Sequence, residues 1–407
     1  MNTINHIAES YVKLSLNIGQ HCEYYVDAYY GPEQWRPSTQ KITLAQLKEN
    51  ALTIISAAEL LNDVQINGQQ ARLDYLTVHL RASLAYIDKL AGVKLDFRSE
   101  CKALYDVVPT EYDEAHFDRV LIELDALVPG KGELNQRFNE YRSEFIIPKD
   151  KLSEVFDAAI NEARRRTLQN IDLPTNENFD VELVHDQVWT AYNWYKGESY
   201  SLIQLNTDIP IYIERAVDLA AHEGYPGHHL FNSLLDKELY NDRGWVEYSI
   251  YNLYGPTSLL AEGSANYGIE VAFPWQQRII FERDTLFPLA GIDQSKAEVY
   301  YQTQTVLHKL SYADNMVAQR YIDNEITAEQ AIGLLMKYSL FNEERARQRL
   351  SFIERNRSYV ITYNYGQDLV RDYLATQVTN DSHKELWLEY LVLLALPKTG
   401  SMMEKPT

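Results

Sequence analysis

Apolar residues recur every three to four positions along most of the chain, which is the period of an amphipathic helix. Before residue 170 this spacing predicts helices at about 3–20, 43–61, 69–90, 114–127, 133–146 and 150–169. From residue 210 it returns and predicts helices at about 211–223, 256–273, 275–288, 295–322, 327–338, 342–375 and 382–396. The hydrophobic pattern therefore predicts a mainly α fold.

The pattern changes from helical to strand-like between residues 188 and 205. Two segments rich in aromatic and β-branched residues, 188–195 and 200–205, flank the turn Lys196-Gly197-Glu198-Ser199. Such segments around a short polar turn predict a β-hairpin or small sheet. The edge of this hairpin is a place where an extended peptide can add as a further strand.

A polar stretch at 170–182, with Pro174 near its middle, interrupts the helical pattern and is interpreted as a linker or lobe crossing. It separates an N-terminal helical lobe, 1–169, from a second helical lobe, 170–407, which holds the candidate chemistry. We expect a large two-lobed helical body with a central cleft. One continuous domain is the alternative, since a chain of 407 residues can build either.

The net charge of −20 argues against a nucleic-acid or anionic-membrane partner, because both require a basic surface. No uninterrupted apolar run reaches the roughly 18 residues of a transmembrane helix, and the N-terminus lacks a signal-peptide pattern. Two cysteines, Cys22 and Cys101, make no disulfide framework and suit a reducing compartment. We therefore expect a cytoplasmic location; the oligomeric state is left open.

Three of the ten histidines fall within eight residues, at His222, His228 and His229, and Glu223 directly follows the first. Imidazoles that hold a metal ion, beside a carboxylate that moves the proton of a water molecule, are typical of zinc hydrolases. Glu262 lies downstream in an apolar segment, where a carboxylate is costly unless it is paired or binds a metal. We expect a zinc site made of His222, a later histidine and Glu262.

The histidine spacing differs from that of a regular HExxH helix, in which the two ligands lie four residues apart on one face. Four residues after His222 stands Pro226, with a glycine nearby on either side. Proline removes a backbone donor and glycine relaxes the backbone, so we expect the helix to bulge or kink after Glu223. The bulge favours His228 as the second ligand. His229 is the alternative if the helix stays nearly straight.

Three motifs, His-Glu-x-x-Pro-Gly-His-His, Glu-Gly-x-Ala-x-Tyr and Tyr-x-x-Gly-x-x-x-x-Arg, resemble those of the bacterial family called domain of unknown function 885. That family is in turn similar to helical zinc metallopeptidases of the carboxypeptidase Taq and thimet-oligopeptidase type. The resemblance covers roughly residues 185–375 and implies a helical zinc peptidase. The matching positions are His222, Glu223, His228, His229, Glu262, Gly263, Ala265, Tyr267, Tyr363, Gly366 and Arg371.

The chain departs from the family pattern at Ser264, where the family has tryptophan, and at Ile269, where it has glutamate. An aspartate and a histidine associated with the stretch before Thr327 are also missing. These departures bear on the type of substrate more than on metal binding.

Glu223 directly follows a metal ligand in the sequence, and its side chain should point in a different direction from the ligand. It is therefore the expected general base. The oxyanion that forms during hydrolysis needs a hydrogen-bond donor besides the metal, and Tyr363, Tyr365 and His308 are candidates. The resemblance favours Tyr363.

Arg357 and Arg371 are candidates for binding a substrate carboxylate, because a guanidinium group binds it with two parallel hydrogen bonds. The alternative for each is a structural salt bridge.

The sequence thus predicts a zinc-dependent hydrolase, first of all a metallopeptidase, that acts on a peptide or small amide substrate with Zn²⁺ as cofactor. A zinc amidase or esterase for a non-peptide substrate would have the same site. The departures at Ser264 and Ile269 leave room for a non-catalytic helical binding protein with a vestigial metal site. Glu223 disfavours a non-hydrolytic metalloenzyme, since that group is typical of water activation.

Overall fold

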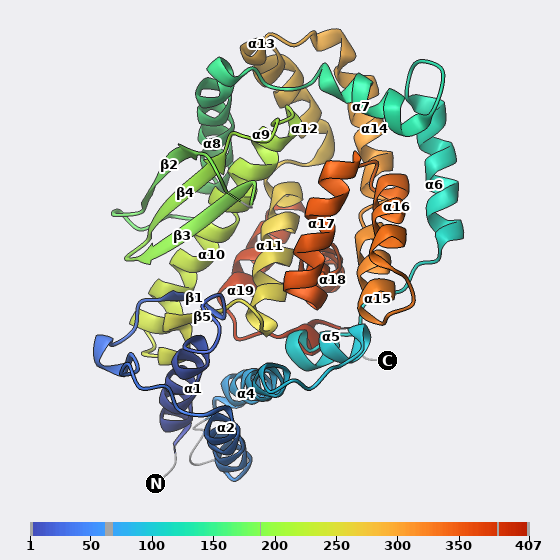
Figure 1. The fold of residues 1–407 in the computed structure, drawn as a ribbon. Helices are drawn as coiled ribbons and strands as arrows, with labels where there is room; N and C mark the ends of the chain where they lie inside the picture. The colour runs from blue at the N-terminus through green and yellow to red at the C-terminus, as the bar shows by residue number, and fades with distance from the viewer. Residues whose placement is uncertain (1–2, 62–67, 188, 381, 405–407) are drawn as a thin grey trace.

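The computed structural model describes residues 3–61, 68–187, 189–380 and 382–404 and confirms a mainly α fold (Figure 1). No helix within these ranges combines the length and the apolar character needed to cross a membrane. Before residue 170 the helices are α1 Ile4–Gly19, η1 Glu33–Trp35, α2 Leu44–Glu59, α4 Gln70–Leu90, α5 Phe97–Tyr105, α6 Glu114–Leu127, α7 Leu134–Ser143, η2 Lys149–Lys151 and α8 Leu152–Leu168.

Short helical elements follow the sheet and lead to the candidate site: α9 Glu214–Leu219, η3 Ala220–Gly224, α10 His228–Leu234, η4 Leu235–Asn241 and η5 Val246–Ser249. The remaining helices are α11 Pro256–Ala272, α12 Trp275–Phe281, η6 Glu282–Leu286, α13 Phe287–Ala290, η7 Gln294–Lys296, α14 Ala297–His308, α15 Ala313–Ile322, α16 Ala328–Tyr338, α17 Glu343–Asn356, η8 Arg357–Val360, α18 Ile361–Gln377, α19 His383–Leu394 and α20 Gly400–Met403.

The predicted hairpin is present as β3 Ala191–Gly197 and β4 Tyr200–Asn206, which pair antiparallel with Trp194 opposite Leu202. Val188, at the start of the predicted hairpin, lies outside the described residues. A third strand, β2 Asn178–Val184, pairs parallel to β4, so that β4 lies in the middle of the sheet. A second small sheet joins β1 Val26–Tyr29 to β5 Ile250–Asn252.

The helix α11 runs through the middle of the molecule, and all its residues except Thr257, Asn266 and Glu270 are buried. It crosses α18 at Gly263 and Gly366, where a Cβ atom on Gly263 would lie 2.4 Å from the carbonyl carbon of Gly366. Because neither position has room for a side chain, the two backbones approach closely. This crossing brings the first turns of α18 beside the middle of α11.

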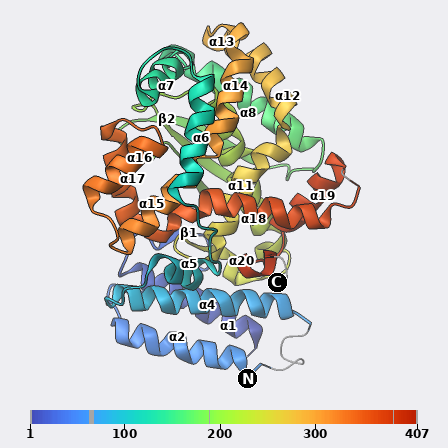
Figure 2. The ribbon, with the colours of Figure 1, turned by 90° about the vertical axis from the view of Figure 1, so that its right-hand side faces the viewer.

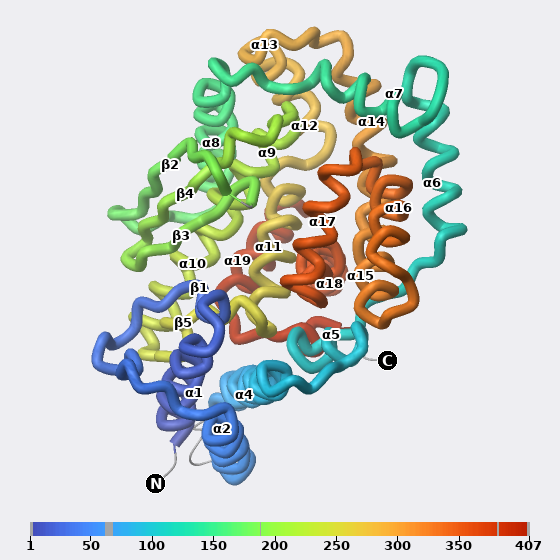
Figure 3. The backbone as a smooth tube through the Cα atoms, in the orientation of Figure 1, coloured from blue at the N-terminus to red at the C-terminus, as the bar shows by residue number. Residues whose placement is uncertain are grey.

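The first 169 residues lie at several places around this centre, with α8 packed against α9 and η3. The helices α1, α2 and α4 lie side by side at one end of the molecule (Figure 2). The tube in Figure 3 shows the chain then passing to α6, which packs against α14 and α16. Buried apolar residues from α1 to α20 form one contiguous cluster. The division into lobes at residue 170 and the cleft between them remain predictions.

Candidate metal centre

Three side chains from three helical elements meet beside the centre of α11. His222 lies in η3, His228 begins α10 and Glu262 lies in α11. One ligand atom from each lies within 4.8 Å of the other two. Oε2 of Glu262 is 3.3 Å from Nε2 of His222 and 3.7 Å from Nε2 of His228. The structure thus places the two histidines and the carboxylate around one point.

The backbone reaches this arrangement through the bulge expected after Glu223. The helix α9 widens into the π-helical turn η3, which ends at an extended Tyr225. The amide of Gly227 then donates a hydrogen bond of 2.9 Å to the carbonyl of Ala221. A Cβ atom on Gly227 would lie 1.9 Å from the carbonyl oxygen of His222, so only glycine allows the chain to fold back here. The next residue, His228, returns beside His222 as a result.

Two partners outside the candidate ligand set orient its members. Nδ1 of His222 donates to Oδ1 of Asn266 over 2.9 Å, since an amide oxygen can only accept; the lone pair on Nε2 then faces Glu262. The amide nitrogen of Asn266 donates to the carbonyl of Tyr363 over 2.9 Å. The hydroxyl of Tyr359 donates to Oε1 of Glu262 over 2.8 Å. One oxygen of the carboxylate is thus occupied, while the other faces the imidazoles.

An unpaired carboxylate oxygen and the spacing of the ligand atoms both fit a zinc ion. Oε2 of Glu262 is buried and has no hydrogen-bond partner among the described residues. Such an orphaned carboxylate oxygen is costly unless a cation satisfies it. Ligand atoms about 2.0–2.2 Å from one tetrahedral zinc ion lie roughly 3.3–3.6 Å apart. The two imidazole–carboxylate distances, 3.3 and 3.7 Å, are close to that spacing.

The electrostatics of the cluster also favour a bound cation. Burial raises the pKa of Glu262, but His228 and His222 together outweigh burial and hold this pKa well below its usual range. Burial lowers the pKa of His228, and the carboxylates of Glu262, Glu223 and Asp27 together more than reverse this, raising it to about 9. Without a metal ion the site thus retains a proton on His228. A divalent cation can take the place of that positive charge.

Glu223 lies in the same turn as His222 and is the expected general base. The residue is 6% exposed, and no hydrogen bond to its carboxylate is present in the described part of the chain. Its negative charge helps to raise the pKa of both His228 and Tyr363, so the carboxylate lies within electrostatic reach of the candidate cluster. Its backbone carbonyl accepts a hydrogen bond of 2.7 Å from Asn193 of β3, which ties the turn to the sheet.

Of the oxyanion-donor candidates, Tyr363 lies within electrostatic reach of the cluster. Burial and the charge of Glu262 raise the pKa of Tyr363, so that its hydroxyl keeps its proton and can donate. Its ring packs edge-on against Tyr359, with the ring centroids 5.7 Å apart. The hydroxyl of Tyr365 instead donates to Glu404, and His308 is exposed at the end of α14.

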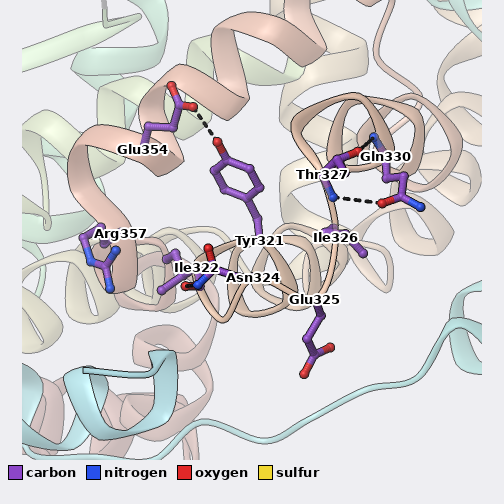
Figure 4. A pocket seen from close by; sticks show the side chains of 9 residues that line it. All are labelled: Tyr321, Ile322, Asn324, Glu325, Ile326, Thr327, Gln330, Glu354 and Arg357. Carbon is purple, nitrogen blue, oxygen red and sulfur yellow. Dashed lines mark hydrogen bonds between the residues drawn. The ribbon is translucent and has the colours of Figure 1, made fainter. Parts of the chain in front are cut away.

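The two candidate substrate arginines form salt bridges elsewhere. Nε of Arg357 is 2.7 Å from Glu100, and the residue lines a surface cavity of about 540 Å³ with Tyr321 and Glu354 (Figure 4). His222, His228 and Glu262 are absent from the described lining of that cavity. Arg371 pairs with Asp368 and, over 2.6 Å, with Glu270. The substrate-binding role of both arginines remains a prediction.

Sequence reasoning missed Asn266 and Tyr359. A signal existed for Asn266, because it follows Glu262 by four residues and therefore lies on the same face of α11. Tyr359 precedes Tyr363 by four residues but lies in the separate element η8, which the prediction had included in one continuous helix, 342–375. It reaches Glu262 only through the close crossing of α11 and α18.

Replacing Asn266 by alanine is expected to weaken zinc binding about 10- to 100-fold, because His222 loses the acceptor that fixes its tautomer. Asn266→Asp should restore most of the affinity, since a carboxylate accepts the same hydrogen bond. The measurement is competition for zinc with a chromogenic chelator. An unchanged zinc affinity in Asn266→Ala would show that this hydrogen bond does not orient the ligand.

The molecule is therefore a mainly α protein with a His–His–Glu cluster that fits zinc. The fold is similar to that of a predicted lipoprotein from Colwellia psychrerythraea, with a TM-score of 0.51 and 15% sequence identity over 91% of this chain and 70% of that chain. It is also similar to a predicted lipoprotein of unknown function from Shewanella oneidensis, with a TM-score of 0.51 and 12% identity over 88% of this chain and 72% of that one.

A weaker likeness connects the chain to the M32 carboxypeptidase from Deinococcus radiodurans R1. Its TM-score is 0.36, with 10% identity over 95% of this chain and 87% of the carboxypeptidase. No protein-family model matches the chain, and no curated protein matches it. Because the sequence identities are low, the likeness to the two predicted lipoproteins supports the fold alone. The TM-score of the carboxypeptidase is too low to support any conclusion about this chain.

Proposed function

We propose that the protein is a zinc-dependent hydrolase, and within that class a metallopeptidase. The observation that carries the proposal is Oε2 of Glu262, which is buried, lacks a hydrogen-bond partner among the described residues and faces Nε2 of His222 and His228. His222, His228 and Glu262 would hold the ion, because two imidazoles and one carboxylate leave an open fourth position in a catalytic zinc site. Glu223 beside them supplies a free carboxylate.

A zinc ion in this place would lower the pKa of a water molecule towards about 7 and polarise the substrate carbonyl. Glu223 takes a proton from the attacking water and passes it to the leaving nitrogen as the C–N bond breaks. Tyr363 donates a hydrogen bond to the carbonyl oxygen as it becomes negative. Asn266 holds His222, and Tyr359 holds Glu262, so that neither side chain has to reorient during the reaction.

A peptide is the favoured substrate because an edge strand of the small sheet lies next to the cluster. The strand β3 is at one edge of its sheet, and Asn193 in that strand contacts the backbone of Glu223. An extended peptide that pairs with β3 would pass the proposed general base. A small amide substrate is the second possibility for the same site. The proposed location is the cytoplasm, in keeping with the free cysteines Cys22 and Cys101.

The proposal is tested with protein reconstituted with zinc and incubated with a mixed library of short peptides and with amide and ester probes. We expect cleavage of peptide bonds, read by mass spectrometry, that is lost on adding phenanthroline and restored by zinc. Cleavage of the probes but not of the peptides would favour an amidase or esterase. Stoichiometric zinc without turnover on any substrate would favour a binding protein with a vestigial site.

A further inference from the structure

The two adjacent histidines at the start of α10 have different surroundings. His228 belongs to the candidate metal cluster with His222 and Glu262, whereas His229 is fully buried on the side of the sheet. Nδ1 of His229 is 2.8 Å from Oγ of Ser201 in β4, and Nε2 is 3.0 Å from Oε1 of Glu177, just before β2. Its ring packs edge-on against Phe179, with the ring centroids 5.2 Å apart. His229 is thus held by contacts in several directions.

Ser201, His229 and Glu177 are connected by hydrogen bonds like the serine, histidine and acid of a hydrolase triad, but they cannot act as one. Ser201 and His229 are both 0% exposed, so a substrate cannot reach the serine hydroxyl. A nucleophilic serine must meet the scissile carbonyl directly. Because Glu177 can only accept, Nε2 of His229 donates to it, and the hydroxyl of Ser201 is left to donate to Nδ1. The array is therefore a fully satisfied buried network.

Glu177 holds the chain on both sides of His228. Its Oε1 accepts hydrogen bonds from the hydroxyl of Tyr225 and from Nε2 of His229, while Oε2 is 3.1 Å from Arg164 of α8. Tyr225 precedes His228 by three residues, and His229 directly follows it. The segment that carries the second candidate metal ligand is thus attached at two points to one buried carboxylate. Arg164 partly compensates the charge of that carboxylate.

We propose that Glu177 and His229 are positioning residues that hold the segment 225–229 against the sheet and thereby place Nε2 of His228 opposite Glu262. This inference rests on the proposed metal site. It gives Glu177 and His229 a role that is neither that of a metal ligand nor that of a general base. It also explains why two consecutive histidines are useful: one faces the ion and the other anchors the backbone. Outer partners of this kind typically change metal affinity about 10- to 100-fold.

The test uses the full chain and measures zinc affinity by chelator competition, together with the visible absorption spectrum of the cobalt-substituted protein. His229→Ala and Glu177→Ala are each expected to weaken zinc binding about 10- to 100-fold and to change the cobalt spectrum. His229→Gln should recover much of the affinity, because its amide can still donate to Glu177. Ser201→Ala is the milder variant should the alanine substitutions prevent folding, with a smaller loss in the same direction.

His79→Ala is the matched control. His79 is a buried histidine of α4 with hydrogen bonds of 2.8 Å to the carbonyl of Tyr75 and to Thr257, and its described hydrogen bonds include none to the three candidate ligands. Its loss should lower the thermal stability but leave zinc affinity and the cobalt spectrum unchanged. Equal losses of affinity in His79→Ala and His229→Ala would overturn the inference, as would a folded His229→Ala that binds zinc normally.

Failure of this inference can be told apart from failure of the proposed hydrolase function, because neither measurement depends on turnover. Zinc binding that needs His229 without any hydrolysis would support the positioning role and contradict the hydrolase. Hydrolysis that is retained with normal zinc affinity in His229→Ala would do the opposite. A wild-type protein that binds no zinc would overturn both.

Discussion

Replacing Glu223 by glutamine is expected to lower kcat about 10²- to 10⁴-fold, the usual contribution of a general base, while zinc content stays at that of the wild type. Glutamine keeps the size of the side chain but cannot take a proton from water. Glu223 is buried beside the cluster and is not one of its three ligand residues, so the metal should remain. The measurements are steady-state kinetics on a peptide cleaved by the wild type and elemental analysis of the same sample.

Glu270→Gln is the control for this substitution. Glu270 lies in α11, like Glu262, but it is exposed and pairs with Arg371. Its loss should leave kcat nearly unchanged. A Glu223→Gln protein with wild-type kcat would remove Glu223 from the proton transfer, and a loss of zinc in that variant would instead make it a ligand.

His222→Ala and His228→Ala are each expected to weaken zinc binding by about 100- to 1,000-fold and to abolish hydrolysis at limiting zinc. A structural zinc site, which has four protein ligands, is worth roughly 10–16 kcal/mol, so one ligand carries roughly 2.5–4 kcal/mol. This loss should exceed the 10- to 100-fold effect of removing an outer partner such as His229. The measurement is zinc competition with a chelator on folded, metal-free protein.

The order of the effects matters as much as their size. If His229→Ala weakened zinc binding more than His228→Ala, the assignment of the second ligand would be reversed. Full zinc affinity in His222→Ala would remove that histidine from the ligand set. Both outcomes would contradict the geometry in which His222 and His228 face the same oxygen of Glu262.

The helical period predicted most of the fold because the buried residues of helices such as α2 (Leu47, Ala51, Ile55 and Ala58) recur at helical spacing. The strand β2 was missed, and residues 178–182 were interpreted as part of a linker. Phe179, Val181 and Leu183 do alternate with polar residues as in a strand, but the segment is short, most of its residues are exposed, and it continues a polar stretch. The predicted helix 342–375 is broken at Arg357, whose positive φ of 50° turns the chain between α17 and α18. No sequence pattern marks that turn.

The candidate site could be predicted in its parts but not in its arrangement. The motif indicated the histidines and glutamates, because two histidines with an adjacent glutamate are typical of metal-dependent hydrolases. The choice between His228 and His229 depended on the width of the turn η3 and on the contacts of His229 with Ser201 and Glu177, which lie outside the motif. Glu177 offered no signal, since it stands in a polar stretch far from the histidines in the chain.

X-ray diffraction from zinc-soaked crystals, recorded on both sides of the zinc absorption edge, tests the central claim most directly. The account predicts one anomalous peak within bonding distance of Nε2 of His222, Nε2 of His228 and Oε2 of Glu262. It would be contradicted by crystals in which the soaked protein shows no peak at this place, or in which the ion lies against His229 and Glu177 instead.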